Sequence, residues 1–189
     1  GALLENLNDQ DTDVIFIKNI ENVVPDRLKE TTIQYKKALA GVVLDFQKKV
    51  FSYIQQLDNQ SVSDTILNEI NQFLIHDLCT LPPQDFGSYS RDGQIEYFKQ
   101  KLNRQLRVCG MVQNVGEPGG GPFWAKNSDD SVSLQVVESA QIDLKNQDQK
   151  EIFDKATHFN PVDLICTMKN HKGEKYNLAG LIISIVLKH

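Results

Sequence analysis

The sequence contains few of the residue patterns that assign a function directly, beginning with cysteine. It has three cysteines, Cys79, Cys109 and Cys166, and no C-x-x-C pair, so neither a zinc site nor a disulfide framework is expected. Cys109 and Cys166 lie in apolar, strand-like runs, where a free thiol behaves as a small hydrophobe. Buried, reduced thiols favour a cytoplasmic location.

Signatures of nucleotide binding and of nucleophilic catalysis are also missing. There is no G-x-x-x-x-G-K-[ST] and no G-x-G-x-x-G opening a helix, which excludes a P-loop or a dinucleotide fingerprint. No Ser/His/Asp or Cys/His pattern has local support. His158 stands alone between an expected helix and strand, and such a histidine is more often structural than catalytic.

The chain also lacks a strongly basic stretch and a long apolar run. Its net charge is -5, so nucleic acid and anionic membrane surfaces are not expected as partners. The apolar run Leu178–Leu187 is about half of the ~20 residues that span a bilayer and is expected to be a buried strand or an exposed edge. Residues 1–5 lack the basic and apolar regions of a signal peptide, and the chain is expected to begin inside a folded element.

What the chain does contain is an alternation of helical and strand-like apolar patterns, which predicts an α/β protein with a parallel or mixed sheet. A long amphipathic helix is expected over Leu28–Leu57, with Gly41 bending or interrupting it. Ser61 is the expected N-cap of the following helix, which Pro82 and Pro83 end, and Asp92 is the expected cap of a third helix. These three helices form an expected helical insertion, about residues 26–105, in one domain over 1–189. The other expected elements are an N-terminal helix, a polar helix at 147–156, strands at 13–19, 108–112, 132–137 and 162–168, and a turn at Lys172-Gly173.

The segment Gly116–Trp124 is the most distinctive part of the chain. Four of its nine residues are glycine and two are proline, so it combines backbone freedom with fixed φ angles and resembles a loop that approaches a ligand. The equal alternative is a plain solvent-exposed connection. Phe123 and Trp124 either stack on a ring of a ligand or, more often in such settings, pin the loop to the core.

Three segments carry a resemblance to known families: residues 16–25, residues 109–112 and residues 134–142. The chain from residue 1 to about 177 resembles a domain-of-unknown-function family, and within it the three segments are similar to the UDP-sugar and N-acetylhexosamine pyrophosphorylases. That resemblance implies a partial nucleotidyltransferase-like fold, Rossmann-like and of the glycosyltransferase-A type, with a mixed sheet.

The resemblance also implies roles for four residues. Glu21 stands where the family has an aspartate that binds Mg²⁺, and the longer side chain puts that role in question because Mg²⁺ demands near-ideal octahedral geometry. Asn22 is expected near the sugar phosphate, and Gly110 is expected to offer its backbone to the sugar. Glu138 is expected to accept hydrogen bonds from sugar hydroxyls.

These implications predict a fragment of a sugar-phosphate nucleotidyltransferase-like protein that binds a sugar phosphate or nucleotide with Mg²⁺. The glycine-rich nucleotide loop and the asparagine-rich strand of that family are absent, so no activity is expected of the chain alone, and the tail from Ala179 departs from the family pattern. The alternative is a non-catalytic sugar- or nucleotide-binding regulatory module. A further alternative is an interaction scaffold in which the helix Leu28–Leu57 pairs with a partner. The sequence leaves the oligomeric state open.

Overall fold

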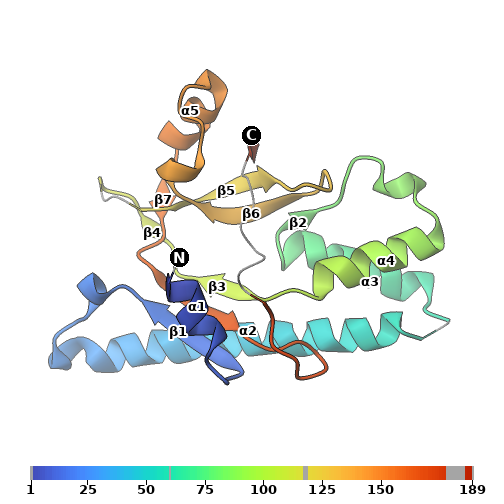
Figure 1. Cartoon of the computed structure of the whole chain (residues 1–189), viewed down its shortest axis with the longest axis horizontal. Coiled ribbons are helices and arrows are strands. Elements are labelled where there is room, and N and C mark those ends of the chain that lie inside the picture. Colours follow the sequence, from blue (N-terminus) through green and yellow to red (C-terminus); the bar gives the residue numbers. More distant parts are fainter. Residues whose placement is uncertain (1, 60, 117–118, 178–185, 189) are drawn as a thin grey trace. The chain divides into compact units, whose positions relative to one another are not determined.

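The computed structural model describes residues 2–59, 61–116, 119–177 and 186–188, which form a mixed α/β structure (Figure 1). The chain divides into two compact units, each described by itself below. Unit 1 comprises Gly1–Gln60, Leu102–Gly110 and Val162–Ile182, and unit 2 comprises Ser61–Lys101, Met111–Pro161 and Ile183–His189. The predicted α/β class is therefore confirmed, and the helices expected as one insertion are shared between the two units.

Unit 1 is built on a three-stranded sheet in the order β1-β8-β3. β1 and β3 run in the same direction, but β8 lies between them and pairs antiparallel with each. The expectation of a parallel or mixed sheet is wrong for the described strands, all of whose pairs are antiparallel. In unit 1 the reason is that β8, which comes from a distant part of the chain, occupies the central position. The elements of unit 1 are α1 (Ala2–Asn8), β1 (Val14–Lys18), η1 (Ile20–Asn22), η2 (Asp26–Leu28), α2 (Lys29–Leu57), β3 (Arg107–Cys109) and β8 (Asp163–Thr167).

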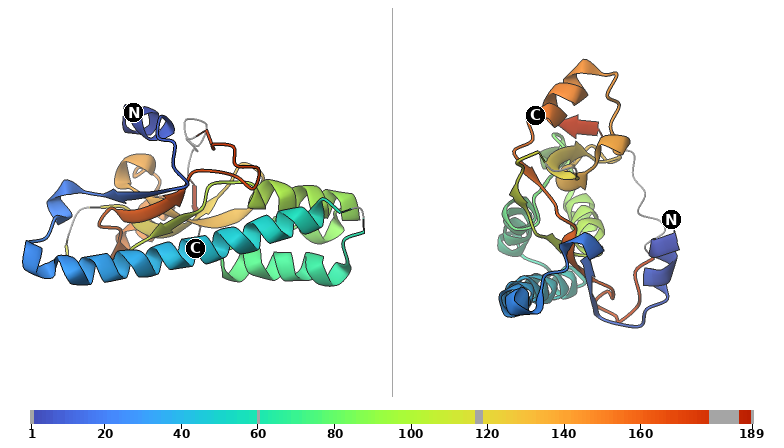
Figure 2. Two further views of the ribbon diagram at one scale, coloured as in Figure 1. Left: turned by 90° about the horizontal axis from the view of Figure 1, so that it is seen from below. Right: turned by 90° about the vertical axis from the view of Figure 1, so that its left-hand side faces the viewer.

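The long helix α2 packs against the strands β8 and β3 of this sheet (Figure 2). It is one uninterrupted helix, and Gly41 lies in it without breaking it. The expected apolar stripe is buried mainly in the second half of the helix, where the buried residues are Val43, Val50, Ile54 and Leu57. The first half instead exposes Ile33, Tyr35 and Val42, so only part of the stripe lies in the core.

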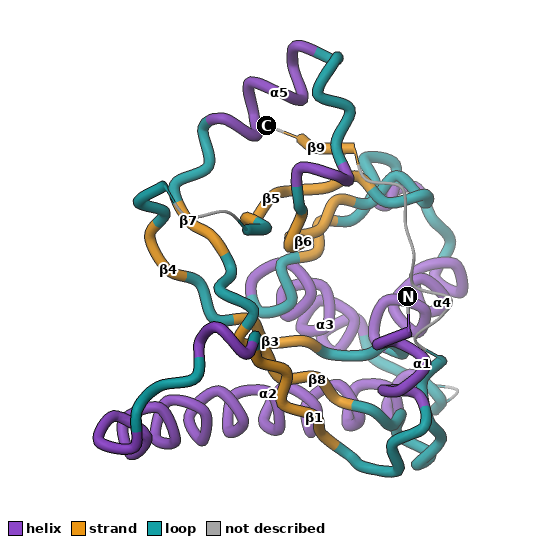
Figure 3. Tube along the Cα trace, turned by 60° about the vertical axis from the view of Figure 1, so that its left-hand side comes forward, coloured by secondary structure: helices purple, strands orange, loops and turns teal. Residues whose placement is uncertain are grey.

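Unit 2 combines helices with a sheet in the order β2-β6-β5-β9 and a separate ribbon of β4 and β7 (Figure 3). All of its strand pairs are antiparallel. The elements of unit 2 are α3 (Asp64–His76), β2 (Thr80–Leu81), η3 (Phe86–Ser88), α4 (Arg91–Leu102), β4 (Val112–Gln113), β5 (Gly121–Lys126), β6 (Val132–Val137), η4 (Ser139–Gln141), α5 (Gln147–Asp154), β7 (His158–Phe159) and β9 (Val186–Lys188).

The hairpin of β5 and β6 forms the centre of the unit 2 sheet. Strand β5 begins inside the glycine-rich segment, so residues 121–124, which were expected in a loop, form a strand. Pairing with β6 explains this, since Gly121 lies opposite Val137 and Lys126 opposite Val132. The expected strand 108–112 is split into β3 and β4, which pair in different sheets.

Two of the expected helix caps are misplaced. Ser63, and not Ser61, precedes α3, and its hydroxyl accepts a hydrogen bond from the backbone N–H of Ile66. The hydroxyl of Ser90 accepts from the N–H of Gly93 at the start of α4, whereas Asp92 lies inside that helix. Helix α3 ends at His76, before the two prolines expected to end it, because β2 intervenes.

The turn expected at Lys172-Gly173 is present, with Gly173 at a φ of +79°. Most of the apolar run Leu178–Leu187 and of the departing tail lies outside the described residues. Within the described ranges, no helix combines the length and the apolar character needed to cross a membrane.

Candidate functional site

The C-terminal ends of β1 and β3 meet at one edge of the unit 1 sheet. At the end of β1, Lys18 pairs with Asp163, the first residue of β8. The next residue, Asn19, donates its backbone N–H to the carbonyl of Val162 at 3.0 Å. On the other side of β8, the N–H of Gly110 donates to the carbonyl of Asp163 at 2.8 Å. The segments that follow β1 and β3 therefore both start beside residues 162–163, where the central strand β8 begins. We call this end of the sheet the β8 edge.

Glu21 and Asn22 lie in the 3-10 turn η1, directly after β1 at the β8 edge. Glu21 is exposed, and the side chain amide of Asn19 donates to its carboxylate at 3.4 Å. Asn22 is half-buried, and its backbone N–H donates to the carbonyl of Asn19 at 3.1 Å. The structure thus brings the segments of Glu21, Asn22 and Gly110 to one edge of one sheet.

Gly110 is explained by its close approach to β8. A Cβ at this position would lie 3.3 Å from the carbonyl oxygen of Asp163, which is tighter than most contacts of that kind allow. The Asp163 carboxylate in turn lies 3.2 Å from the ammonium of Lys36 on α2. Val162 has a φ of +55°, an unusual conformation for a β-branched residue. Lys36 and Asp163 were not singled out by the sequence, because no local pattern connects residues so far apart in the chain.

Glu138 belongs to unit 2, where it follows β6 and caps the short helix η4. Its carboxylate accepts the backbone N–H of Gln141, and the Gln141 side chain oxygen accepts the N–H of Glu138 at 3.0 Å. This reciprocal pair is a capping box, and the spacing of Glu138 and Gln141 in the sequence is typical of one. The cap gives Glu138 a local structural role, while its side chain remains exposed.

The glycines of the distinctive segment are required by neighbouring side chains. A Cβ on Gly119 would lie 2.9 Å from the ring of Phe159, and one on Gly121 would lie 2.8 Å from the ring of Phe123. A Cβ on Gly120 would be 2.9 Å from Val136. Phe123 is buried in a cluster with Val137 and Ile142. Packing, the more frequent role for such an aromatic residue, therefore accounts for Phe123 and for the three glycines.

A small open cavity lies beside this packed segment, and we call it the α5 pocket. Its volume is about 210 Å³. Three elements supply its walls: the start of β5, the end of α5 and the β4–β7 ribbon. The residues that line it are Asn114, Gly119, Gly121, Phe123, Phe153, Asp154, Ala156 and His158.

Backbone hydrogen bonds hold these walls together. The N–H of Asn114 donates to the carbonyl of Thr157 at 2.9 Å, which extends the β4–β7 ribbon. The N–H of Asn160 donates to the carbonyl of Gly120 at 2.7 Å, which ties β7 to the start of β5. The sequence favours a structural role for His158. It does not reveal the pocket as a whole, because the lining residues come from four segments, of which only the glycine-rich one is distinctive in the sequence.

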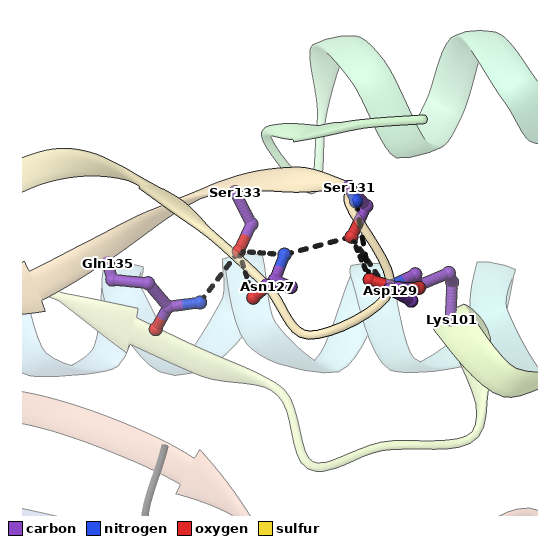
Figure 4. Close-up of polar contacts among 6 residues, drawn as sticks. All are labelled: Lys101, Asn127, Asp129, Ser131, Ser133 and Gln135. Carbon is purple, nitrogen blue, oxygen red and sulfur yellow. Dashed lines mark hydrogen bonds and ion pairs between the residues drawn. The ribbon is translucent and has the colours of Figure 1, made fainter. Parts of the chain in front are cut away.

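A buried polar network joins α4 to the turn of the β5–β6 hairpin (Figure 4). The Lys101 ammonium lies 2.6 Å from the Asp129 carboxylate and donates to the Ser131 hydroxyl at 2.8 Å. Ser131 also donates to Asp129 at 2.6 Å and accepts from Asn127 at 2.9 Å. Ser133 continues the network by accepting from Asn127 at 3.1 Å. Lys101, Ser131 and Ser133 are buried, and Asn127 links the two serines, so the network joins the helix to the hairpin in a structural role.

Two opposing effects determine the pKa of the Asp129 carboxyl group. Burial raises its pKa, but hydrogen bonds from Lys101 and Ser131 and the Lys101 charge lower it by more, so its pKa lies below the ordinary value. Asp129 is therefore held as a carboxylate that neutralises the buried ammonium.

No group of three or more His, Cys, Asp or Glu side chains that could hold a metal ion occurs within the part of the chain that the structure describes. Glu21 at the β8 edge remains the carboxylate that the sequence predicts for this purpose.

The described residues form a mixed α/β protein with one candidate binding place in unit 1, the β8 edge, and one in unit 2, the α5 pocket. Residues 1–183 match the family described as "Domain of unknown function (DUF4301)", and the chain belongs to that family. No curated protein and no solved structure matches the chain significantly. The membership confirms the expected domain-of-unknown-function resemblance, while the likeness to pyrophosphorylases stays a prediction.

Proposed function

We propose that this chain supplies the sugar-phosphate or nucleotide binding part of a nucleotidyltransferase-like protein and has no activity by itself. One observation carries the proposal: Glu21, Asn22 and Gly110, which the sequence resemblance selects, belong to segments that start together at the β8 edge. Ligands of α/β proteins commonly bind where strands end at one edge of a sheet.

Charge at the β8 edge is compatible with a phosphate. The Lys36 ammonium supplies a positive charge there through its ion pair with Asp163, and a phosphate competes for such a group with the carboxylate. The strained backbone of Val162 lies at the same place, and strain of this kind concentrates at functional sites.

A magnesium ion fits the carboxylate of Glu21 at this edge. Mg²⁺ is commonly held by one or two carboxylates together with substrate phosphates and water, and Glu21 is an exposed carboxylate beside Asn22. Glu21 would hold the metal, which would supply positive charge for the ligand phosphates. In this proposal the ligand is a small molecule, the protein is cytoplasmic, and neither nucleic acid nor a membrane is a partner.

The alternative is a non-catalytic sugar- or nucleotide-binding regulatory module. The Glu138 carboxylate, expected to bind sugar hydroxyls, is engaged in the cap of η4, and the described residues offer no cluster of metal ligands.

Thermal unfolding of the full chain with UDP-sugars, sugar 1-phosphates and nucleoside triphosphates, with and without Mg²⁺, tests the proposal. A ligand at 100 times its Kd stabilises the fold by about 2.7 kcal/mol. We expect stabilisation that needs Mg²⁺ and is lost in Glu21→Gln but kept in Glu30→Gln, a matched change at an exposed glutamate of α2.

Three outcomes have distinct meanings. Stabilisation by phosphate ligands that is the same without Mg²⁺ and in Glu21→Gln would support the regulatory module instead. An equal loss in Glu21→Gln and Glu30→Gln would remove the role of Glu21. No response to any phosphate ligand would contradict both proposals.

A further inference from the structure

We propose that the α5 pocket of unit 2 binds an uncharged sugar ring. This goes beyond the proposed function, because none of Glu21, Asn22, Gly110 and Glu138 lines the pocket.

The size of the pocket limits the ligand to a single ring. An enclosed cavity of roughly 150 Å³ accommodates benzene, and the α5 pocket has a volume of about 210 Å³ and is open to solvent. A six-membered ring with its hydroxyl groups fits such a space, with some substituents reaching into water. A complete sugar nucleotide does not fit inside it.

One wall of the pocket is a rigid aromatic surface. The rings of Phe123 and Phe153 stack with their centroids 5.5 Å apart and 21° between their planes. Phe123 is buried against Val137, so it fixes the position of Phe153, which is only half-buried. The C–H face of a sugar can pack on a ring presented in this way, because that face is apolar while the rim of the sugar is polar.

The other walls offer mixed hydrogen-bonding groups. Asn114, Asp154 and His158 each line the pocket. The hydroxyl of Thr157 lies 2.9 Å from Nδ1 of His158, so Nε2 is the ring nitrogen that can face a ligand. An amide, a carboxylate and an imidazole together donate and accept, and sugar hydroxyls do both.

The charges of the lining exclude a phosphate. Among the described residues that line the pocket there is no lysine or arginine, while the carboxylate of Asp154 is one of the lining groups. That carboxylate would repel a phosphate, and none of the described lining residues is a lysine or arginine that could offset the repulsion. The ligand is therefore uncharged, which separates this pocket from the β8 edge with its Lys36.

Titration of the isotope-labelled full chain, followed by NMR, tests the proposal. The probes are D-glucose, D-galactose, D-mannose and N-acetyl-D-glucosamine, with glucose 1-phosphate and uridine as comparisons, all without metal. We expect at least one free sugar to bind at millimolar concentration, to shift the Phe153 ring signals, and to bind at least fivefold more tightly than glucose 1-phosphate.

Two variants locate the site. Asp154→Asn should weaken sugar binding several-fold and should reduce the difference in affinity between the free sugar and glucose 1-phosphate. Asp148→Asn, a matched change at an exposed residue of the same helix that does not line the pocket, should leave both unchanged. Phe153→Leu keeps an apolar side chain but removes the ring, and it should abolish binding; the unbound spectra report whether each variant is folded.

The proposal is overturned if no free sugar binds at 50 mM, if glucose 1-phosphate binds as tightly as glucose, or if only uridine shifts the Phe153 signals. Its failure is separable from failure of the proposed function. Binding in the α5 pocket needs no Mg²⁺ and survives Glu21→Gln, whereas binding at the β8 edge depends on both.

Discussion

The ammonium of Lys101 on α4 lies 2.6 Å from the carboxylate of Asp129 in the β5–β6 turn, although 28 residues separate them in the chain. The Lys101 side chain is almost completely buried, whereas Asp129 is 41% exposed. Removing the lysine would therefore remove the hydrogen bond that its ammonium donates to the buried Ser131 hydroxyl and the ion pair that it forms with the Asp129 carboxylate.

Lys101→Met should lower the free energy of unfolding of unit 2 by about 2–3 kcal/mol, because breaking a buried pair leaves polar groups unsatisfied. Urea unfolding followed by the fluorescence of Trp124, the single tryptophan and part of β5, measures this. Lys150→Met, at an exposed position of α5, should change stability by less than about 0.5 kcal/mol. Equal effects of the two variants would show that the network contributes nothing.

The ion pair of Lys101 and Asp129 also predicts that the stability of the protein depends on pH in the acidic range. The pKa of Asp129 is lowered in the fold, so its contribution is present above the unfolded pKa of about 3.9 and is lost as the pH falls through the lower folded value. Wild type should lose stability below pH 4 more steeply than Lys101→Met. If the stability of the two proteins fell equally with decreasing pH, the pairing of Asp129 with Lys101 would not be the cause of the lowered Asp129 pKa.

Two glycines should respond to alanine in opposite directions. Gly121→Ala places a Cβ 2.8 Å from the Phe123 ring and 3.2 Å from the carbonyl of His158, and we expect a loss of about 1–3 kcal/mol. Gly41→Ala meets nothing within 4 Å inside α2, and we expect a gain of up to about 1 kcal/mol. Denaturant unfolding measures both, and stabilisation by Gly121→Ala would disprove the close packing of β5.

Ionisation of the thiols of Cys166 and Cys109 should lower the free energy of unfolding of unit 1 at alkaline pH. Burial is the main cause that raises the pKa of Cys166 to about 11, with Arg107 opposing and Cys109 adding to it, and burial likewise raises the pKa of Cys109. Their contribution is complete below the unfolded thiol pKa and is lost as the pH rises from about 9 towards 11.

We expect the stability difference between wild type and Cys166→Ala to shrink by roughly 2–3 kcal/mol over that range, since one pKa unit corresponds to about 1.4 kcal/mol. Comparing the two proteins removes the effect of Tyr176, whose pKa burial raises to about 12. A difference that stays constant with pH would mean that the Cys166 thiol is accessible to water in the fold. Iodoacetamide should also modify Cys166 slowly at pH 7 until the chain is unfolded.

Ser63→Ala should cost about 1 kcal/mol, because it removes the hydroxyl that accepts the N–H of Ile66 at the start of α3. Ser61→Ala is the matched control, and it should have almost no effect since Ser61 lies outside that cap. Thermal unfolding of the two variants decides between the observed cap and the one expected from the sequence.

Local patterns predicted the elements of this protein well. The apolar period of α2 and the β-branched run of β1 each lie within one short segment, so the sequence contains the whole signal. Strand β5 was missed because its first residues, Gly121 and Pro122, are typical of loops and become a strand only by pairing with Val137 and Val136 of β6.

The candidate sites were predicted less completely. The resemblance selects Glu21, Asn22 and Gly110, whose segments lie at the β8 edge, but it gives no indication that Glu138 caps η4. The sequence indicates only one wall of the α5 pocket, the glycine-rich segment with Phe123, because the other walls come from α5 and the β4–β7 ribbon.

Residues that are neighbours in the chain specify the helices, most strands, the glycine content of the segment Gly116–Trp124 and the family, because each of these depends on local sequence. Tertiary structure decided that β8 lies between β1 and β3, that the three glycines serve packing, and that Lys101 meets Asp129. The physical reason is that strand partners and buried contacts form between distant residues, whose choice depends on the free energy of the whole fold and not on any local pattern.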